Sequence, residues 1–96
     1  MRRKITKEMI AKAFVDYQFN GKTQLEIADN LGVSSSTISY NLKYFAMDAA
    51  VKENINRNLD IPTPHTELAN AFHLTVSQFD MLVILGRNKM GLNPIL

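Results

Sequence analysis

The stretch Thr23–Lys43, TQLEIADNLGVSSSTISYNLK, decides the fold of this chain. It predicts two short helices joined by a tight turn. Thr23 is a favoured N-cap residue, and Glu26 three residues later completes a capping box in which each side chain satisfies an orphan backbone N–H. Gly32 follows the first helix, where the chain leaves through a positive φ that glycine adopts without penalty. Ser34 then caps the second helix.

The two predicted helices differ in the width of their apolar faces. The first has four apolar residues at helical spacing, namely Leu25, Ile27, Ala28 and Leu31. The second is anchored only by Ile38 and Leu42, four residues apart. The residues between and beside these anchors have side chains that are nearly all able to form hydrogen bonds: Ser35, Ser36, Thr37, Ser39, Tyr40, Asn41 and Lys43. A helix that packs through one narrow apolar stripe and carries small polar residues over its N-terminal half is able to enter a major groove and approach base edges.

This pattern resembles the helix-turn-helix superfamily of DNA-binding proteins, in which the second helix is the recognition helix. The matching residues are Ile27, Ala28, Leu31, Gly32, Val33, Ser34, Thr37 and Ile38. The resemblance implies that Ala28 lets the helices approach each other and that Gly32 makes the turn. The last anchor, at Leu42 rather than Asn41, looks more like sigma-factor region four than a lambda-type repressor. The alternative is a helical hairpin used only for packing or protein contact.

We expect the predicted helix over residues 34–44 to read bases in the major groove of double-stranded DNA. Base contacts are predicted from Ser35, Ser36, Ser39, Tyr40 and Lys43, whose polar groups suit base edges, while the tyrosine ring also suits a thymine methyl. Phosphate contacts are predicted from Lys22, Thr23, Gln24 and Ser34 at helix starts, and from the basic arm Arg2, Arg3 and Lys4. An ordinary charged terminus is the alternative for the arm.

Charge is unevenly distributed along the 96 residues. Residues 1–43 hold seven Lys and Arg against four Asp and Glu, a balance of about +3, and residues 44–96 hold four against five, about −1. The basic part coincides with the motif, which favours a polyanionic partner, although a surface charged for solubility explains the same numbers.

Other functional classes lack their residues. There is no cysteine, so disulfides and thiolate metal sites are excluded, and the two histidines, eight residues apart, have no third ligand at a suitable spacing. The glycines are isolated, and Ser34–Ser36 has no neighbouring base. We therefore expect no catalysis, cofactor or metal. The longest apolar run, Met81–Leu85, is too short to cross a bilayer, and we expect a cytoplasmic, nucleoid-associated protein, in a bacterium or a host cell.

Helices are also predicted on both sides of the central stretch. Thr6 begins one with a core stripe of Ile10, Ala13, Phe14 and Tyr17, and Asn20-Gly21 ends it. After Lys43 no breaker occurs before Pro62, so either one long helix runs towards Asn58 or a new helix starts at Asp48. We favour the break, because Asp48 is a plausible cap. Thr63-Pro64 predicts an N-cap and first helical residue for a helix reaching Phe72.

An internal repeat with an offset of 41 residues relates Glu26–Ser34 to Glu67–Thr75. In the second copy His73 replaces the turn glycine, and Asp80 takes the place of Ser39. Its second helix, VSQFDMLVIL, is apolar nearly all round and is predicted to end at Gly86. We therefore expect it to pack or dimerise through Phe79, Met81, Leu82, Val83 and Leu85. A second DNA-reading head and a protein partner at this helix are the alternatives.

The predicted fold is all-α, a small bundle of about five to six helices with an N-terminal tri-helical helix-turn-helix and a C-terminal helical hairpin. Its parts are a DNA-binding unit over residues 1–46, a linker helix and hinge over 47–63, and a degenerate second motif over 64–96. The predicted function is a DNA-binding transcriptional regulator, a homodimeric repressor of the kind found in phages, plasmids and bacteria. The alternatives are a DNA packaging or replication assembly protein resembling a small terminase subunit, and a protein-binding antirepressor or inhibitor.

Overall fold

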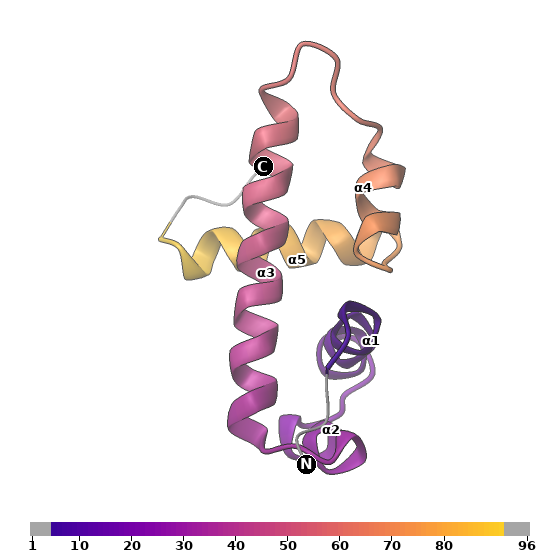
Figure 1. The fold of residues 1–96 in the computed structure, drawn as a ribbon, viewed down its shortest axis with the longest axis vertical. Helices are drawn as coiled ribbons and strands as arrows, with labels where there is room; N and C mark the ends of the chain where they lie inside the picture. The colour runs from indigo at the N-terminus through magenta and orange to yellow at the C-terminus, as the bar shows by residue number, and fades with distance from the viewer. Residues whose placement is uncertain (1–4, 92–96) are drawn as a thin grey trace. The chain divides into compact units, whose positions relative to one another are not determined.

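The computed structural model describes residues 5–91, and within them the chain forms helices and no strands. The helices are α1 Lys7–Gln18, α2 Gln24–Leu31, α3 Ser35–Arg57, α4 His65–Ala71 and α5 Val76–Lys89 (Figure 1). The predicted all-α fold is confirmed. The chain divides into two compact units, unit 1 over Met1–Leu42 and unit 2 over Lys43–Leu96, so α3 contributes its first two turns to one and the remainder to the other.

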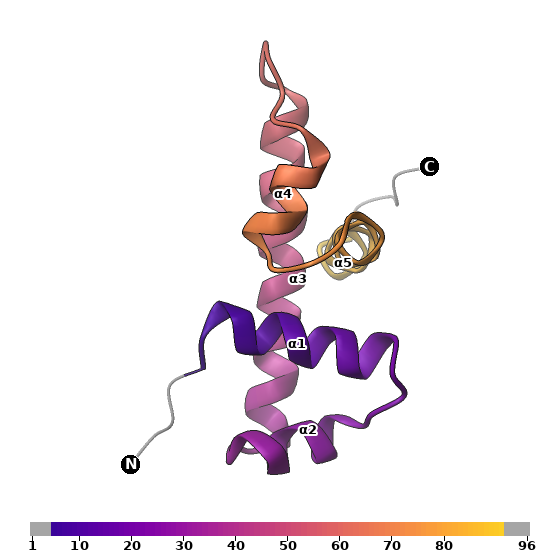
Figure 2. The same cartoon turned by 90° about the vertical axis from the view of Figure 1, so that its right-hand side faces the viewer.

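In unit 1, the local signals of the sequence set the ends of the helices. The Thr6 hydroxyl accepts a hydrogen bond from the Met9 N–H, and Thr23 and Glu26 form the predicted capping box. Gly32 ends α2 in the left-handed region, at φ 71°. Figure 2 shows α1 beside α2. The buried apolar residues of unit 1 are Ile10, Ala11, Ala13, Phe14, Ile27, Ala28, Ile38 and Leu42.

Two residues that we predicted to be buried in unit 1 are exposed. Leu25 has 62% of its surface exposed, because at 100° per residue it lies on the opposite side of α2 from the buried Ile27. Tyr17 shares the angular position of the buried Ile10, but it lies in the last turn of α1 and its ring is also exposed. The prediction was wrong for both, since spacing along a helix does not say how far the neighbouring helix extends.

The break predicted at Asp48 is wrong, since α3 is continuous over 23 residues. Asp48 does not cap a new helix. Its carboxylate instead accepts from the Lys52 ammonium one turn later, at 3.1 Å, and Glu53 pairs in the same way with Arg57, at 2.8 Å. Such i,i+4 pairs support a helix interior.

The loop between α3 and α4 is closed by a side chain that the sequence did not single out. Asn56 of α3 accepts from the Thr63 N–H at 2.7 Å and donates to the Thr63 carbonyl at 3.1 Å. Pro64, not Thr63, is the N-cap of α4, and it makes no side-chain capping bond. The predicted Thr63 cap is therefore wrong, because its backbone is bound back to α3.

In unit 2, α4 and α5 form the predicted C-terminal hairpin and pack on the second part of α3. Its buried residues are Phe45, Ala46, Ala49, Ala50, Ala69, Phe72, Leu74, Phe79, Leu82, Val83 and Gly86. The Phe72 ring, directly after the end of α4, lies 5.5 Å from Phe45 of α3 and 5.2 Å from Phe79 of α5. Unit 2 is thus tri-helical as well, with the second part of α3 as its first helix.

Glycine 86 lies inside α5, not at its end as we predicted, because the helix continues to Lys89.

Within the described residues no single helix is long and apolar enough to cross a membrane. The pair α4 and α5 passes that test only when joined, across a bend of 77°.

Candidate nucleic-acid interface

A helix-turn-helix is built from α2, the turn at Gly32 and the start of α3. The Val33 N–H donates to the Ala28 carbonyl at 3.0 Å, which closes the turn. Ser34 then caps α3, because its hydroxyl accepts from the Thr37 N–H at 3.1 Å. Ala28 is buried, and its small side chain permits the close packing that the motif needs.

The first turns of α3 separate buried anchors from an exposed polar face. Ile38 and Leu42 are buried in the core. The five predicted base-contacting residues are all exposed, namely Ser35, Ser36, Ser39, Tyr40 and Lys43. The first acidic residue of α3 is Asp48, so no carboxylate on these turns opposes a phosphate backbone. The Lys43 ammonium lies 5.9 Å from the centre of the Tyr44 ring, a cation–π distance that orients the lysine.

The predicted phosphate contacts fall into three groups. The Thr23 N–H donates to the Glu26 carboxylate at 3.2 Å, and the hydroxyls of Thr23 and Ser34 both serve as helix caps. Lys22 and Gln24 are half-buried and have no such capping role. The basic arm, Arg2, Arg3 and Lys4, lies outside the described residues. Lys22 and Gln24 are therefore the candidates at the start of α2 whose side chains are not committed to a cap.

The second copy of the motif has the same backbone turn as the first. The Leu74 N–H donates to the Ala69 carbonyl at 3.0 Å, which matches the Val33 to Ala28 bond, and Thr75 with Gln78 forms a capping box on α5. His73 adopts φ 57°, as predicted for the residue in place of the turn glycine. The internal repeat is therefore structural as well as sequential.

The apolar residues of α5 are used inside unit 2. Phe79, Leu82 and Val83 are buried, and Met81 and Leu85 are half-buried. Asp80, at the position equivalent to Ser39, is exposed. Its carboxylate Oδ1 shares a hydrogen bond of 2.5 Å with Nε2 of the His65 ring. The face that is hydroxyl-rich in the first copy is thus apolar and acidic in the second.

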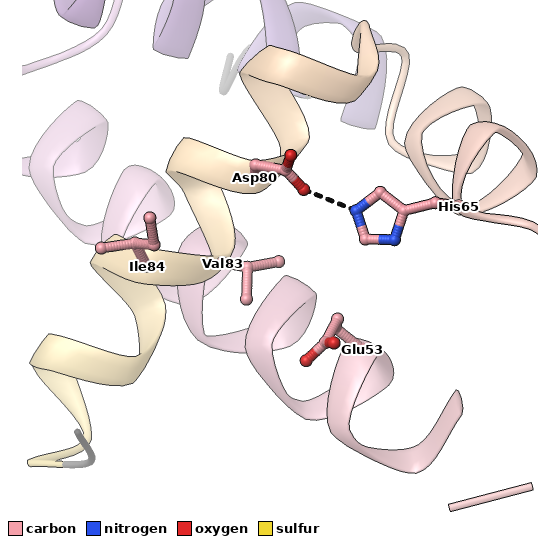
Figure 3. A pocket seen from close by; sticks show the side chains of 5 residues that line it. All are labelled: Glu53, His65, Asp80, Val83 and Ile84. Carbon is pink, nitrogen blue, oxygen red and sulfur yellow. Dashed lines mark hydrogen bonds and ion pairs between the residues drawn. The ribbon is translucent and has the colours of Figure 1, made fainter. Parts of the chain in front are cut away.

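A cavity of about 250 Å³ lies in unit 2 beside this face (Figure 3). It is lined by Glu53 of α3, His65 of α4, and Asp80, Val83 and Ile84 of α5. Arg57 holds the Glu53 carboxylate through two nitrogens, at 3.1 and 2.8 Å, and this hydrogen bonding raises the pKa of the guanidinium. Each polar group of the lining is therefore already paired. Among residues 5–91 no cluster of three His, Cys, Asp or Glu is suited to a metal ion.

Sequence reasoning missed this cavity, because His65 and Asp80 lie 15 residues apart and only the turn between α4 and α5 brings them together.

No family model, no curated protein and no solved structure matches the chain.

Proposed function

We propose that the chain is a sequence-specific DNA-binding transcriptional regulator, of the repressor type, that inserts the first turns of α3 into the major groove. The observation that carries this proposal is the exposed face of Ser36, Ser39, Tyr40 and Lys43 directly after a helix-turn-helix bend. Hydroxyls read several base edges as donors or acceptors, and Lys43 suits guanine or a phosphate. Phosphate contacts at the start of α2 come from Lys22 and Gln24, helped by the basic arm.

The test is selection of binding sites from a random duplex pool, followed by a salt titration with the selected site. Enrichment of one sequence with affinity that falls steeply in salt supports the regulator. Ring-shaped oligomers with loose sequence preference favour a packaging or replication protein instead. If the chain does not bind DNA, or binds it with an affinity that does not change with salt, a protein-binding module is favoured.

Ser36→Ala and Tyr40→Ala are each expected to weaken binding to the selected site by about 1–3 kcal/mol and to relax its specificity, because each removes a base-reading group. The measurement is fluorescence anisotropy with the selected duplex and with single base-pair variants of it. Ser77→Ala is the matched control, since Ser77 is exposed on α5 at the position equivalent to Ser36. Full affinity and discrimination in both test variants would refute the proposed reading face.

Lys22→Ala is expected to weaken binding to all duplexes alike and to reduce the slope of log K against log salt by about one unit, because one phosphate contact is lost. The salt titration is repeated with the selected and a scrambled duplex. Lys89→Ala, an exposed lysine of α5, is the control. An unchanged slope for Lys22→Ala would remove this residue from the interface.

A further inference from the structure

Five large apolar side chains along α3 and the turn after it are exposed in unit 2. We call Tyr44, Val51, Ile55, Leu59 and Ile61 the apolar strip. The first three belong to α3 and the other two to the turn that follows it, and their exposed fractions run from 45% at Val51 to 88% at Ile61. Monomeric proteins rarely expose apolar patches of more than a few hundred Å², and larger patches mark interaction surfaces. The apolar strip is therefore a candidate interface.

The helical members of the apolar strip share one side of α3. Tyr44, Val51 and Ile55 are spaced by seven and four residues, which places them within one narrow arc. The buried residues on this part of α3 take the other side, namely Phe45, Ala46, Ala49 and Ala50, and of these Phe45 contacts Phe72 while Ala46 and Ala50 lie against Gly86 of α5. The hairpin of unit 2 thus packs on the far side of the helix from the apolar strip.

We infer that the apolar strip is where two copies of this chain pair, with α3 of one copy antiparallel to α3 of the other. The charges beside the strip carry this choice. Asp48 and Lys52 are about half exposed at its flank and pair with each other within the chain at 3.1 Å, while the Lys52 ammonium also lies 5.9 Å from the centre of the Phe72 ring. A two-fold axis near residue 50 sets Tyr44 against Ile55 of the second copy. It also sets Asp48 against Lys52 of the second copy, because the centres of the two pairs differ by only half a residue along the helix. Parallel pairing would place this flank of the two copies on opposite sides of the interface, so that Asp48 would not meet Lys52 of the second copy.

The exposed area also fits a second copy. Five large apolar side chains, each about half exposed or more, offer on the order of several hundred Å² per copy, and the stems of Asp48 and Lys52 add to it. A specific interface buries about 800 Å² per partner. The strip thus supplies the apolar centre of such an interface, whereas Phe79, Leu82 and Val83, which we expected to pack or dimerise, are buried within one chain.

This inference deepens the proposed function, since a dimer presents two recognition helices to an inverted repeat, but pairing is measured without DNA. In sedimentation experiments on the full chain we expect a dimer whose dissociation constant rises about 30-fold or more in Ile55→Glu, the effect of losing an interface anchor. Leu25→Glu is the matched control, because Leu25 is equally exposed but lies on α2. Circular dichroism checks that both variants keep their helices. A wild-type chain that is monomeric throughout, or an Ile55→Glu variant that dimerises normally, overturns the inference.

The antiparallel arrangement has its own test, because the chain contains no cysteine. Val51→Cys, near the axis, is expected to form a disulfide between two copies on mild oxidation. Ile55→Cys is not, because its two copies would lie about 16 Å apart along the helices at 1.5 Å per residue. Tyr44→Cys combined with Ile55→Cys is expected to cross-link. Efficient cross-linking of Ile55→Cys alone overturns the antiparallel pairing.

The DNA measurements separate the two ideas. A monomer that still binds a selected duplex overturns the inference and leaves the proposed function standing. A dimer that cross-links through Val51→Cys without binding any duplex supports the inference and refutes the proposed function.

Discussion

Gly86→Ala is expected to lower the free energy of unfolding by about 3 kcal/mol, the upper end of the cost of overpacking a core. A Cβ at this position would lie 2.0 Å from the Ala46 carbonyl oxygen, 2.6 Å from the Ala46 carbonyl carbon and 2.9 Å from the Ala50 Cβ. Two of these atoms are backbone, so no rotamer change relieves the clash and α5 must move away from α3. In an open helix the same substitution stabilises by about 1 kcal/mol, so the sign of the change identifies the close approach.

Urea unfolding followed by circular dichroism measures this change. Gly21→Ala is the control, because a Cβ at Gly21 meets nothing within 4 Å and the cost comes only from its φ of 72°. That cost is about 1–2 kcal/mol. A Gly86→Ala variant as stable as the wild type would contradict the crossing of α3 and α5 at this residue.

Gly86 also shows where sequence reading reaches its limit. An isolated glycine after an apolar run is the usual end of a helix, and we predicted an end there. The structure uses the glycine for contact between two helices, which depends on a partner 40 residues earlier in the chain. Asp48 is a similar case, because a carboxylate that can cap a helix can equally pair with a lysine one turn later. Neither choice is decided within a short window of sequence.

Features decided locally were predicted correctly. The capping box at Thr23, the turn at Gly32 and its counterpart at His73 involve residues close together in the sequence. The same holds for the hydroxyl-rich face of α3, whose exposure follows from its narrow apolar stripe. The box that Gln78 forms with Thr75 was not predicted. The exposure of Leu25 depends instead on which side of a short helix meets its neighbours.

The apolar strip was also out of reach of the sequence. Its residues have the spacing of a core stripe, and the apolar run of α5 was the stronger candidate for a surface that needs a partner. Which of two apolar faces is covered within one chain is settled only by packing. In the structure α5 is covered and the strip on α3 is not buried.

Phe79→Ala is expected to lower the free energy of unfolding by about 3–5 kcal/mol, the cost of emptying a buried aromatic site. The side chain is fully buried, and its ring lies 5.2 Å from Phe72 and 5.4 Å from His65. Phe19→Ala is the matched control, since Phe19 is about half exposed and its ring lies 6.0 Å from the Phe14 ring in an edge-to-face arrangement. Urea unfolding of both variants measures the difference.

The apolar residues of α5 could be covered by their own chain or by a second copy. The stability that Phe79→Ala loses, measured at several protein concentrations, separates these two explanations. If Phe79 is buried by its own chain, as the structure has it, the loss in Phe79→Ala is the same at low and high protein concentration. If a second copy covered it, the wild type would gain stability with concentration and the variant would not, because dimerisation is linked to folding by mass action. Ile55→Glu is expected to behave differently from Phe79→Ala. The stability of a single chain stays that of the wild type, and only the gain in stability with protein concentration is lost. The two substitutions therefore locate the core and the pairing surface on different helices.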